Sequence, residues 1–324
     1  MKTATKVWLI VAVALVFAGL IIILGVMTVL KWDWSRFSTD KFESNSSEIT
    51  EEYKNISITT NTAHIVFIPS ENEKTVVTCY ERDNEKHTVT VKDNTLTVEL
   101  VDTRKWYEHI GITMGTPKIT VYLPMNEYAA LTVNGSTGDV SLPQAFKFES
   151  IDISISTGDA NCYSSAAGAI NIKTRTGHIN VCDLSAGTLE LCVTTGNVTA
   201  SGVSCEGKVN VSVSTGKSYL SDVRCKELIS NGDTGDISMM NVIATDKFSV
   251  ERSTGDVKLE GCDAAEIVIT TDTGDVWGSL LSDKVFITHT DTGKVDTPKT
   301  TVGGRCEITT DTGDIKIQIK EKTA

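Results

Sequence analysis

The chain has few of the residues on which most catalytic and nucleic-acid-binding sites depend. Its 324 residues include only five histidines and five prolines, and 42 acidic residues outnumber 30 basic ones. A net charge of −12 argues against nucleic acid as a partner, because such binding is dominated by Lys and Arg contacts to phosphate. No Gly-x-Ser-x-Gly elbow or phosphate loop occurs, which argues against an enzyme. Neither Cys-x-x-Cys nor His-x-x-x-His occurs, so we expect no zinc, other metal or cofactor site.

One long apolar run stands near the N-terminus. Val7–Leu30 contains 24 residues without a charge, and as a helix it would be about 36 Å long, enough to cross a hydrocarbon core of about 30 Å. A cleavable signal peptide has a shorter apolar region. We therefore expect a short cytoplasmic tail (1–6), a transmembrane helix (7–30) and a polar tether (31–52), with the C-terminal part outside the cell membrane.

The rest of the chain has the pattern of β structure, with a fixed repeat in its larger part. Residues 53–133 contain short alternating segments separated by turn residues and predict an N-terminal β section or cap. In residues 134–324 the dipeptide Thr-Gly occurs ten times at intervals of 19 or 20 residues, and such periodicity indicates a structural repeat. The glycines are Gly138, Gly158, Gly177, Gly196, Gly216, Gly235, Gly255, Gly274, Gly293 and Gly313.

Alignment on these glycines shows which positions face the interior. Apolar residues recur two and four residues after the glycine, and seven and five residues before the next one. This alternation predicts two short strands per repeat. One repeat cannot bury its own inner face, whereas stacked repeats can. The predicted fold is an all-β parallel β-solenoid, or β-helix, of about nine coils plus a final strand.

The Thr-Gly pairs have a structural interpretation as corners between coils. Glycine accepts a positive φ where a Cβ would clash, and the Asp or Asn that often follows suits a turn. Asp272 stands in an Asp-Thr-Gly triplet like that of an aspartic protease, but four such triplets at the repeat spacing indicate a corner instead. A column of corner carboxylates that includes Asp236, Asp256 and Asp275 is the competing interpretation, as a Ca²⁺ site.

The eight cysteines leave two readings open. Cys205 and Cys225 occupy a small-residue position nine residues after the glycine, as buried thiols often do. They are also expected on adjacent coils, within reach of a disulfide. We favour free buried thiols, and we expect Cys182 and Cys192 to point outward or to lie at corners.

Exposed aromatic residues are the main indication of a binding surface. Tyr219 and Trp277 each lie three residues after a corner glycine, so their side chains are expected to point outward. The segment "RKWYEHIGITMG" (104–115) is expected to cover one end of the solenoid. Lys316, Lys320 and Lys322 are expected to protect the last strand from edge pairing.

The segments "VKDNTLTVEL" and "PKITVYLPMNEYAALTVNGSTGDV", followed by a train of Thr-Gly-Asp repeats, resemble the bacterial putative-adhesin family of β-strand-repeat proteins of unknown function. The resemblance covers roughly residues 50–320. It implies a cell-surface β-solenoid behind one membrane segment and assigns no catalytic residues.

The leading functional hypothesis is a non-enzymatic, adhesin-like module that binds an extracellular or cell-wall polymer. A regulatory ectodomain that senses envelope stress through a membrane-protein partner is the alternative. An exported β-helix enzyme that cleaves polysaccharides is a third possibility, and it requires acidic residues that converge on one patch.

Overall fold

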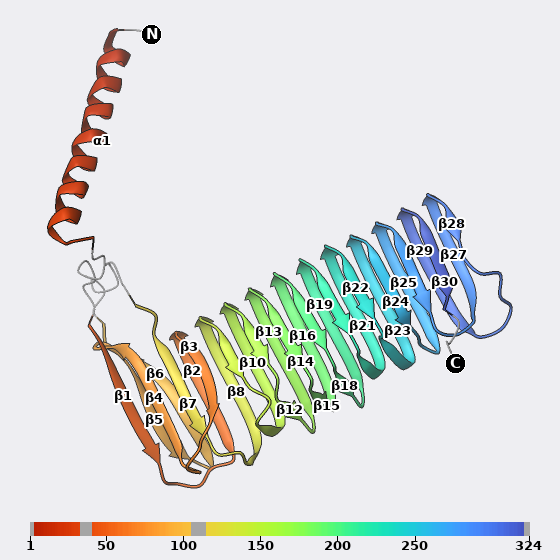
Figure 1. Ribbon diagram of the computed structural model, residues 1–324, viewed down its shortest axis with the longest axis horizontal. Coiled ribbons are helices and arrows are strands. Elements are labelled where there is room, and N and C mark those ends of the chain that lie inside the picture. Colours follow the sequence, from red (N-terminus) through yellow and green to blue (C-terminus); the bar gives the residue numbers. More distant parts are fainter. Residues whose placement is uncertain (1–2, 33–40, 105–114, 321–324) are drawn as a thin grey trace.

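A computed structural model describes residues 3–32, 41–104 and 115–320. Helix α1 (Thr3–Val29) is the apolar helix expected from the sequence, and Thr5–Val29 is long and apolar enough to cross a membrane. The remainder is a parallel β-solenoid of about ten turns, drawn out along one axis in Figure 1.

Within residues 41–104 and 115–123, the N-terminal β section contains seven strands. They are β1 (Phe42–Ile49), β2 (Asn55–Thr62), β3 (His64–Pro69), β4 (Thr75–Arg82), β5 (Glu85–Lys92), β6 (Thr95–Asp102) and β7 (Lys118–Leu123). The predicted tether (31–52) is therefore wrong at 42–49, because β1 pairs antiparallel with β4 along its whole length. Its polar sequence hid the strand, since an edge strand with one solvated face needs few apolar residues.

The solenoid starts earlier than the predicted boundary at 134. Strands β2 and β3 form a complete coil, because β2 pairs in parallel with β8 and β3 pairs in parallel with β9. Strands β6 and β7 add a further parallel layer on β2 and β3. Antiparallel β5 and β4 then cover β6 and β7. The cap of this end is thus built onto a coil that precedes it in sequence.

The remaining strands stack coil on coil. They are β8 (Glu127–Thr137), β9 (Val140–Leu142), β10 (Lys147–Thr157), β11 (Ala160–Cys162), β12 (Ser165–Ala166), β13 (Ala169–Thr176), β14 (Ile179–Cys182), β15 (Ser185–Ala186), β16 (Thr188–Thr195), β17 (Val198–Ser201), β18 (Ser204–Cys205), β19 (Lys208–Thr215), β20 (Ser218–Ser221), β21 (Arg224–Thr234), β22 (Ile237–Met240), β23 (Ile243–Thr254), β24 (Val257–Cys262), β25 (Glu266–Thr273), β26 (Val276–Leu280), β27 (Lys284–Thr292), β28 (Val295–Asp296), β29 (Gly304–Thr312) and β30 (Ile315–Ile319). In the coils of β10–β18 a short third strand joins the two that were predicted.

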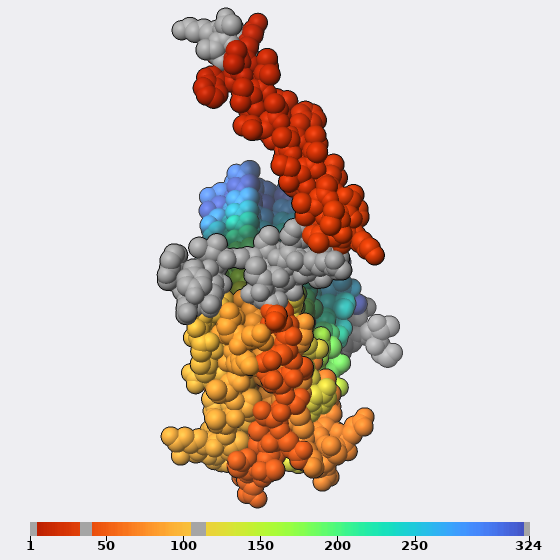
Figure 2. All heavy atoms as spheres, turned by 90° about the vertical axis from the view of Figure 1, so that its left-hand side faces the viewer, coloured from red at the N-terminus to blue at the C-terminus, as the bar shows by residue number. Residues whose placement is uncertain are grey.

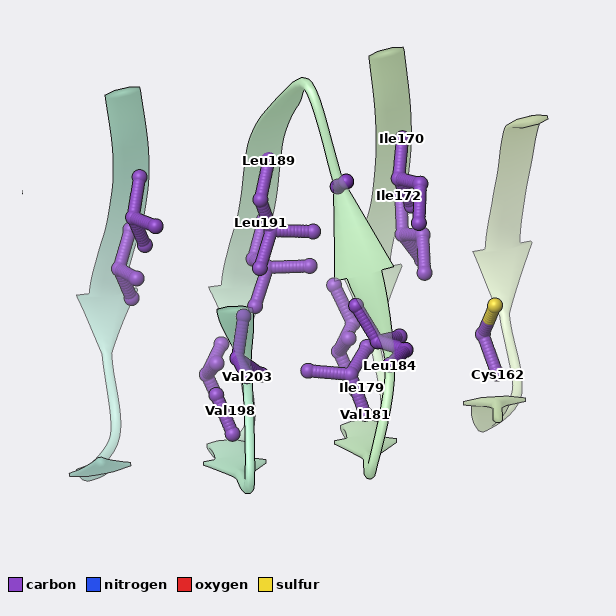
Figure 3. Close-up of a cluster of buried hydrophobic side chains, with 14 of the residues drawn as sticks. Cys162, Ile170, Ile172, Ile179, Val181, Leu184, Leu189, Leu191, Val198 and Val203 are labelled. Carbon is purple, nitrogen blue, oxygen red and sulfur yellow. The ribbon is translucent and has the colours of Figure 1, made fainter. Parts of the chain in front are cut away.

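The core is one aliphatic column inside the coils. The inward residues expected from the alternation, such as Ile170, Ile172, Leu189 and Leu191, are at most 1% exposed. Figure 3 shows these side chains pointing into the coil interior, next to Val181 and its neighbours from the opposite strands. Burial of each such side chain contributes about 1.5–3 kcal/mol, so stacking of coils supplies the main stabilisation of the fold.

The corner glycines form a column in which backbone approaches backbone. Apart from Gly293, all of the repeat glycines have φ between 127° and 157°. A Cβ on Gly196 would lie 1.9 Å from the carbonyl oxygen of Gly177 on the preceding coil. The corner therefore requires glycine for two reasons, the positive φ and the close contact between coils.

The Asp, His or Asn that follows most corner glycines links its coil to a neighbouring one. Oδ1 of Asp159 accepts a hydrogen bond from the backbone N–H of His178 (2.7 Å), and Nδ1 of His178 accepts one from Asn197 N–H (3.1 Å). Oδ1 of Asn197 accepts from Lys217 N–H at 2.8 Å. Asp, His and Asn are interchangeable here because each offers an acceptor. Near Asp272, this acceptor is Asp275, which bonds Asp314 N–H at 2.7 Å.

A second corner of left-handed residues was not expected from the sequence. It lies six residues after the repeat glycine and has φ between 51° and 63°. Its members are Asp183, Gly202, Asp222, Asn241 and Gly261. These are the residue types that tolerate this conformation. Their recurrence at one repeat position could have predicted the second corner.

The C-terminal end has an order that the sequence does not show. Strands β29 and β30 lie between β25–β26 on one side and β27–β28 on the other. The prediction that lysines of the last strand protect an edge is wrong for Lys316, because β28 pairs with Ile315 and Lys316 on the outer side of β30. Lys322 lies outside the described residues. The outer coil instead carries Thr288 and Thr297 at inward positions that are aliphatic in most other coils, as a terminal capping repeat requires.

All eight cysteines lie in the described residues and are free thiols. Cys205 and Cys225 are buried, as expected for their small-residue position. Cys182 and Cys192 are half-buried.

Candidate functional site

Tyr219 and Trp277 lie on one straight row of outward residues. Register pairs join Tyr219 to Ser238, Ser238 to Lys258, and Lys258 to Trp277 on successive coils. Trp277 is then paired with Lys316 of β30. We call Tyr219, Ser238, Lys258, Trp277 and Lys316 the aromatic row. With about 4.8 Å per coil, the two aromatic residues are about 14 Å apart along the axis.

The alternation of the short strands fixes the direction of these side chains. Ser218 and Leu220 are buried on either side of Tyr219, a residue that is 43% exposed. Val276 precedes Trp277 and is buried, but Trp277 itself is only half-buried. The expectation that Trp277 points outward therefore holds for its strand position, while neighbouring side chains cover part of the indole.

Hollows lie on both sides of Trp277. One of about 160 Å³ lies between the two aromatic residues and is also lined by Asp236, Asp256 and Lys258. The other, of about 390 Å³, is lined by Lys258, Trp277, Gly278, Lys316 and Gln318, among others. On each side of the indole of Trp277 there is thus a hollow lined by both apolar and polar groups.

Gly278 helps to form the second hollow. It occupies the inward position four residues after a corner glycine, where most coils have an aliphatic residue. Its φ is 144°, and a Cβ would lie 1.7 Å from the carbonyl oxygen of Leu259. The register of β24 and β26 shifts directly beyond this contact, between Leu259 and Cys262. The two backbones therefore come close at Gly278, and this residue adds no side chain of its own to the hollow beside Trp277.

The charged groups around the small hollow are partly committed to structure. Nζ of Lys217 lies 2.8 Å from Oδ2 of Asp236, and this hydrogen bond lowers the pKa of Asp236 and raises the pKa of Lys217. Oδ1 of Asp256 accepts the backbone N–H of Asp275 at 2.9 Å. The two carboxylates at this hollow thus stabilise the coils, whereas Lys258 is exposed, with Nζ 3.8 Å from Oε2 of Glu260.

A larger hollow of about 780 Å³ lies near β8, β10 and the short strands β12, β15 and β18. Its aromatic residues are Tyr128, Phe146 and Phe148, which are 5%, 0% and 3% exposed. The rings of Tyr128 and Phe148 stack with their centroids 5.6 Å apart. Because these rings are buried in the core, they offer no face to a ligand. The aromatic row is the stronger candidate for that reason.

The other predicted features take structural positions. The corner glycines and the residues that follow them form the corner between coils. Of the predicted end-covering loop at 104–115, residues 105–114 lie outside the described residues. Sequence reasoning missed Lys258 and Lys316, although the position three residues after the glycine would have identified both.

Comparisons with known proteins agree with the family resemblance. A profile of the family described as Toastrack DUF4097 matches residues 53–217 and 206–324. The chain is similar to a crystal structure described as a "putative adhesin" from Bacteroides fragilis NCTC 9343, with 17% identity, a TM-score of 0.44, and coverage of 86% of this chain and 97% of that one. A "putative adhesin" from Parabacteroides distasonis ATCC 8503 has 13% identity, a TM-score of 0.48, and coverage of 84% and 98%. A "putative lipid binding protein" from the same strain has 16% identity, a TM-score of 0.43, and coverage of 87% and 98%. No curated protein matches the chain.

Proposed function

The chain belongs to the Toastrack DUF4097 family, and from this premise we propose that it is a non-enzymatic binding module. Its ligand is a saccharide-containing polymer of the cell wall or extracellular matrix. The observation that carries the proposal is the aromatic row, in which Tyr219 and Trp277 lie on one register with Lys258 between them and Lys316 beyond.

The chemistry of the row fits a repeating, polar ligand. Aromatic rings present a large apolar face together with a polar edge, and such faces pack against the C–H faces of sugar rings. The lysine ammonium groups supply mobile donors for hydroxyl, carboxylate or phosphate oxygens. A solenoid repeats these positions along its axis, so a polymer can contact several coils at once and gain affinity by multivalency.

The carboxylates near the row support binding rather than catalysis. A polysaccharide hydrolase needs two carboxyl groups held free on either side of the scissile bond. Asp236 is instead bonded to Lys217, and Asp256 accepts a backbone N–H from the next coil. Release of either group for acid–base chemistry would disrupt a contact that holds coils together.

Helix α1 supports a location at the membrane. We propose that it anchors the protein, with the short tail before it in the cytoplasm and the solenoid outside. The length and composition of Thr5–Val29 fit such a span. An anchor restricts the solenoid to the cell surface, where a wall polymer is present at high local concentration.

Co-sedimentation with insoluble cell-wall polymer tests the proposal. The detergent-solubilised full chain is expected to pellet with the polymer at low and high salt. Trp277→Ala and Tyr219→Ala are each expected to weaken binding about tenfold, or about 1.4 kcal/mol. Tyr122→Ala is the matched control, because Tyr122 is 37% exposed on β7, outside the row. Failure to pellet at either salt concentration would contradict polymer binding and would direct attention to a regulatory role with a membrane partner.

A further inference from the structure

The N-terminal cap contains a buried cluster of three side chains that the aromatic row does not use. Cys79 and Glu81 lie on the same face of β4, and His87 lies on β5. One sulfur, oxygen or nitrogen atom from each residue lies within 4.8 Å of the other two. The cluster is located at the end of the solenoid that Figure 2 shows, where β1 stands in front of the other cap strands.

The cluster is closed to solvent. The side chains of Glu81 and His87 are 2% and 3% exposed, and Cys79 is 3% exposed. Polar and ionisable side chains of this kind are expensive to bury unless they are hydrogen-bonded or bind a metal. Sidechains with these three donor types, all buried together, are the set that zinc prefers.

Two further strands orient the cluster. Asn45 of β1 donates from Nδ2 to Oε1 of Glu81 at 2.9 Å. Thr60 of β2 lies 2.9 Å from Nε2 of His87 through its Oγ1. Metal-binding histidines usually donate their other ring N–H to a fixed partner, and ligating carboxylates are usually hydrogen-bonded in turn. Asn45 and Thr60 stand where such outer partners are needed.

We propose that Cys79, Glu81 and His87 bind a zinc-class divalent cation that fastens the N-terminal cap. Sγ of Cys79, one carboxylate oxygen of Glu81 and Nδ1 of His87 are the ligands. Zinc bonds of about 2.0–2.3 Å place tetrahedral ligand atoms about 3.3–3.8 Å apart. Because the present atoms lie within 4.8 Å of one another, side-chain adjustments of about 1 Å bring them to that geometry.

The charges balance when the cation binds. Cys79 releases its thiol proton to solvent, and the thiolate and the Glu81 carboxylate together carry two negative charges that neutralise the cation. With the metal bound, His87 carries its proton on Nε2, and this N–H donates a hydrogen bond to Oγ1 of Thr60. The Nδ1 lone pair faces the metal, so Nδ1 no longer hydrogen-bonds to Oε2 of Glu81, which lies 2.8 Å away. The fourth position is left for water or the second carboxylate oxygen.

The motif escapes the usual sequence searches because it is carried by a hairpin. Its spacing is Cys-x-Glu-x₅-His, in which β4 supplies two ligands and β5 the third. Cap strands β1, β4 and β5 lie outside the parallel stack. The metal would link β4 to β5 directly, and β1 would join them through the hydrogen bond from Asn45 to Glu81. This role is independent of polymer binding by the aromatic row.

Cobalt substitution tests the proposal on the reduced full chain, purified in detergent without a histidine tag. After EDTA treatment and dialysis, Co²⁺ is expected to bind with one ion per chain and to show thiolate-to-cobalt charge-transfer absorption. Zn²⁺ is expected to displace it and to raise the Tm. Cys79→Ser should remove the charge-transfer band, whereas Cys306→Ser, at an equally buried cysteine of the solenoid, should retain it.

A variant that keeps all three ligands separates metal binding from folding. Thr60→Val is expected to weaken Zn²⁺ binding about 10–100-fold while the far-UV spectrum of the chain stays the same. Absence of stoichiometric Co²⁺ binding by the wild type would overturn the proposal and leave a buried Glu81–His87 pair. A charge-transfer band that persists in Cys79→Ser would overturn it as well.

Discussion

Arg252 lies directly beside Gly232 of the preceding coil, and the two residues are register partners. A Cβ on Gly232 would be 2.7 Å from Nη1 of Arg252. The guanidinium is 2% exposed, and its Nη2 donates to Oγ of Ser230 (2.8 Å) and Ser218 (3.4 Å). Both serines replace aliphatic residues found at the same positions in other coils. The buried Arg252 therefore explains why Ser218, Ser230 and Gly232 differ from the usual residues of the repeat.

Gly232→Ala is expected to destabilise the solenoid by about 1–3 kcal/mol, because the added methyl overpacks a filled site. The free energy of unfolding from urea titration measures the effect. Arg252→Thr introduces the residue that stands at this position in other coils, at Thr174 and Thr271. In that background, Gly232→Ala should lower the free energy of unfolding by less. Equal costs in both backgrounds would show that the clash is with the carbonyl of Val213, which is also 2.7 Å away.

Asp159→Ala is expected to cost about 1–2 kcal/mol, because the backbone N–H of His178 loses its acceptor. Thermal unfolding measures the loss. Lys294→Ala is the control. Lys294 lies on the outer coil, where its side chain links no further coil, and its backbone N–H, which donates to Asp314, is unchanged in the variant. His178→Asn should retain stability because it keeps an acceptor; a loss as large as that of Asp159→Ala would contradict the corner linkage.

Cysteine modification is expected to follow burial. Burial raises the pKa of Cys162, Cys225 and Cys306 to about 12, so these thiols are protonated at pH 8 and shielded from reagent. Iodoacetamide should label Cys182 and Cys192 first, and the remaining cysteines only after unfolding. Mass spectrometry of peptides after timed alkylation measures the order, and early labelling of Cys162 would contradict it.

The pair of Asp236 and Lys217 predicts a dependence of stability on acid. The folded-state pKa of Asp236 is lowered below the ordinary 3.8 by its hydrogen bond with Lys217. A carboxyl group whose pKa is lower in the folded than in the unfolded state stabilises the fold at pH values above its unfolded-state pKa. This stability is lost as the pH falls through the folded-state pKa. Asp236→Asn should therefore lower the Tm slightly at pH 7 and not at pH 2. The pair is exposed and its effect is small; an equal difference at both pH values would exclude the ion pair as its cause.

The fold could be predicted from the sequence wherever the repeat is local. Corner glycines and alternating apolar residues such as Ile170 and Ile172 predict the coil geometry, because stacked coils need the same residue types at equivalent positions. Strand β1 could not be predicted, since its pairing with β4 depends on a distant cap. The order of β27–β30 also depends on non-local pairing, which periodicity does not encode.

The candidate site was predicted in part. Tyr219 and Trp277 stand at one repeat position, and that position alone indicates an outward row. Chain order would place Asp296 next to Trp277, whereas the inserted strand β30 brings Lys316 there. The cation beside the indole is thus a product of the strand insertion.

The insertion of β29–β30 also sets an order of assembly. The segment 284–296 is made before 304–319, yet it takes the outermost place and rests on those later strands. It cannot dock until the end of the chain has emerged and seated on β25 and β26. The last strands to be made are therefore placed inside the stack, between β25–β26 and β27–β28. A chain that stops short of residue 304 is expected to lose two coils, the missing β29–β30 and also β27–β28, which has no coil to pair with.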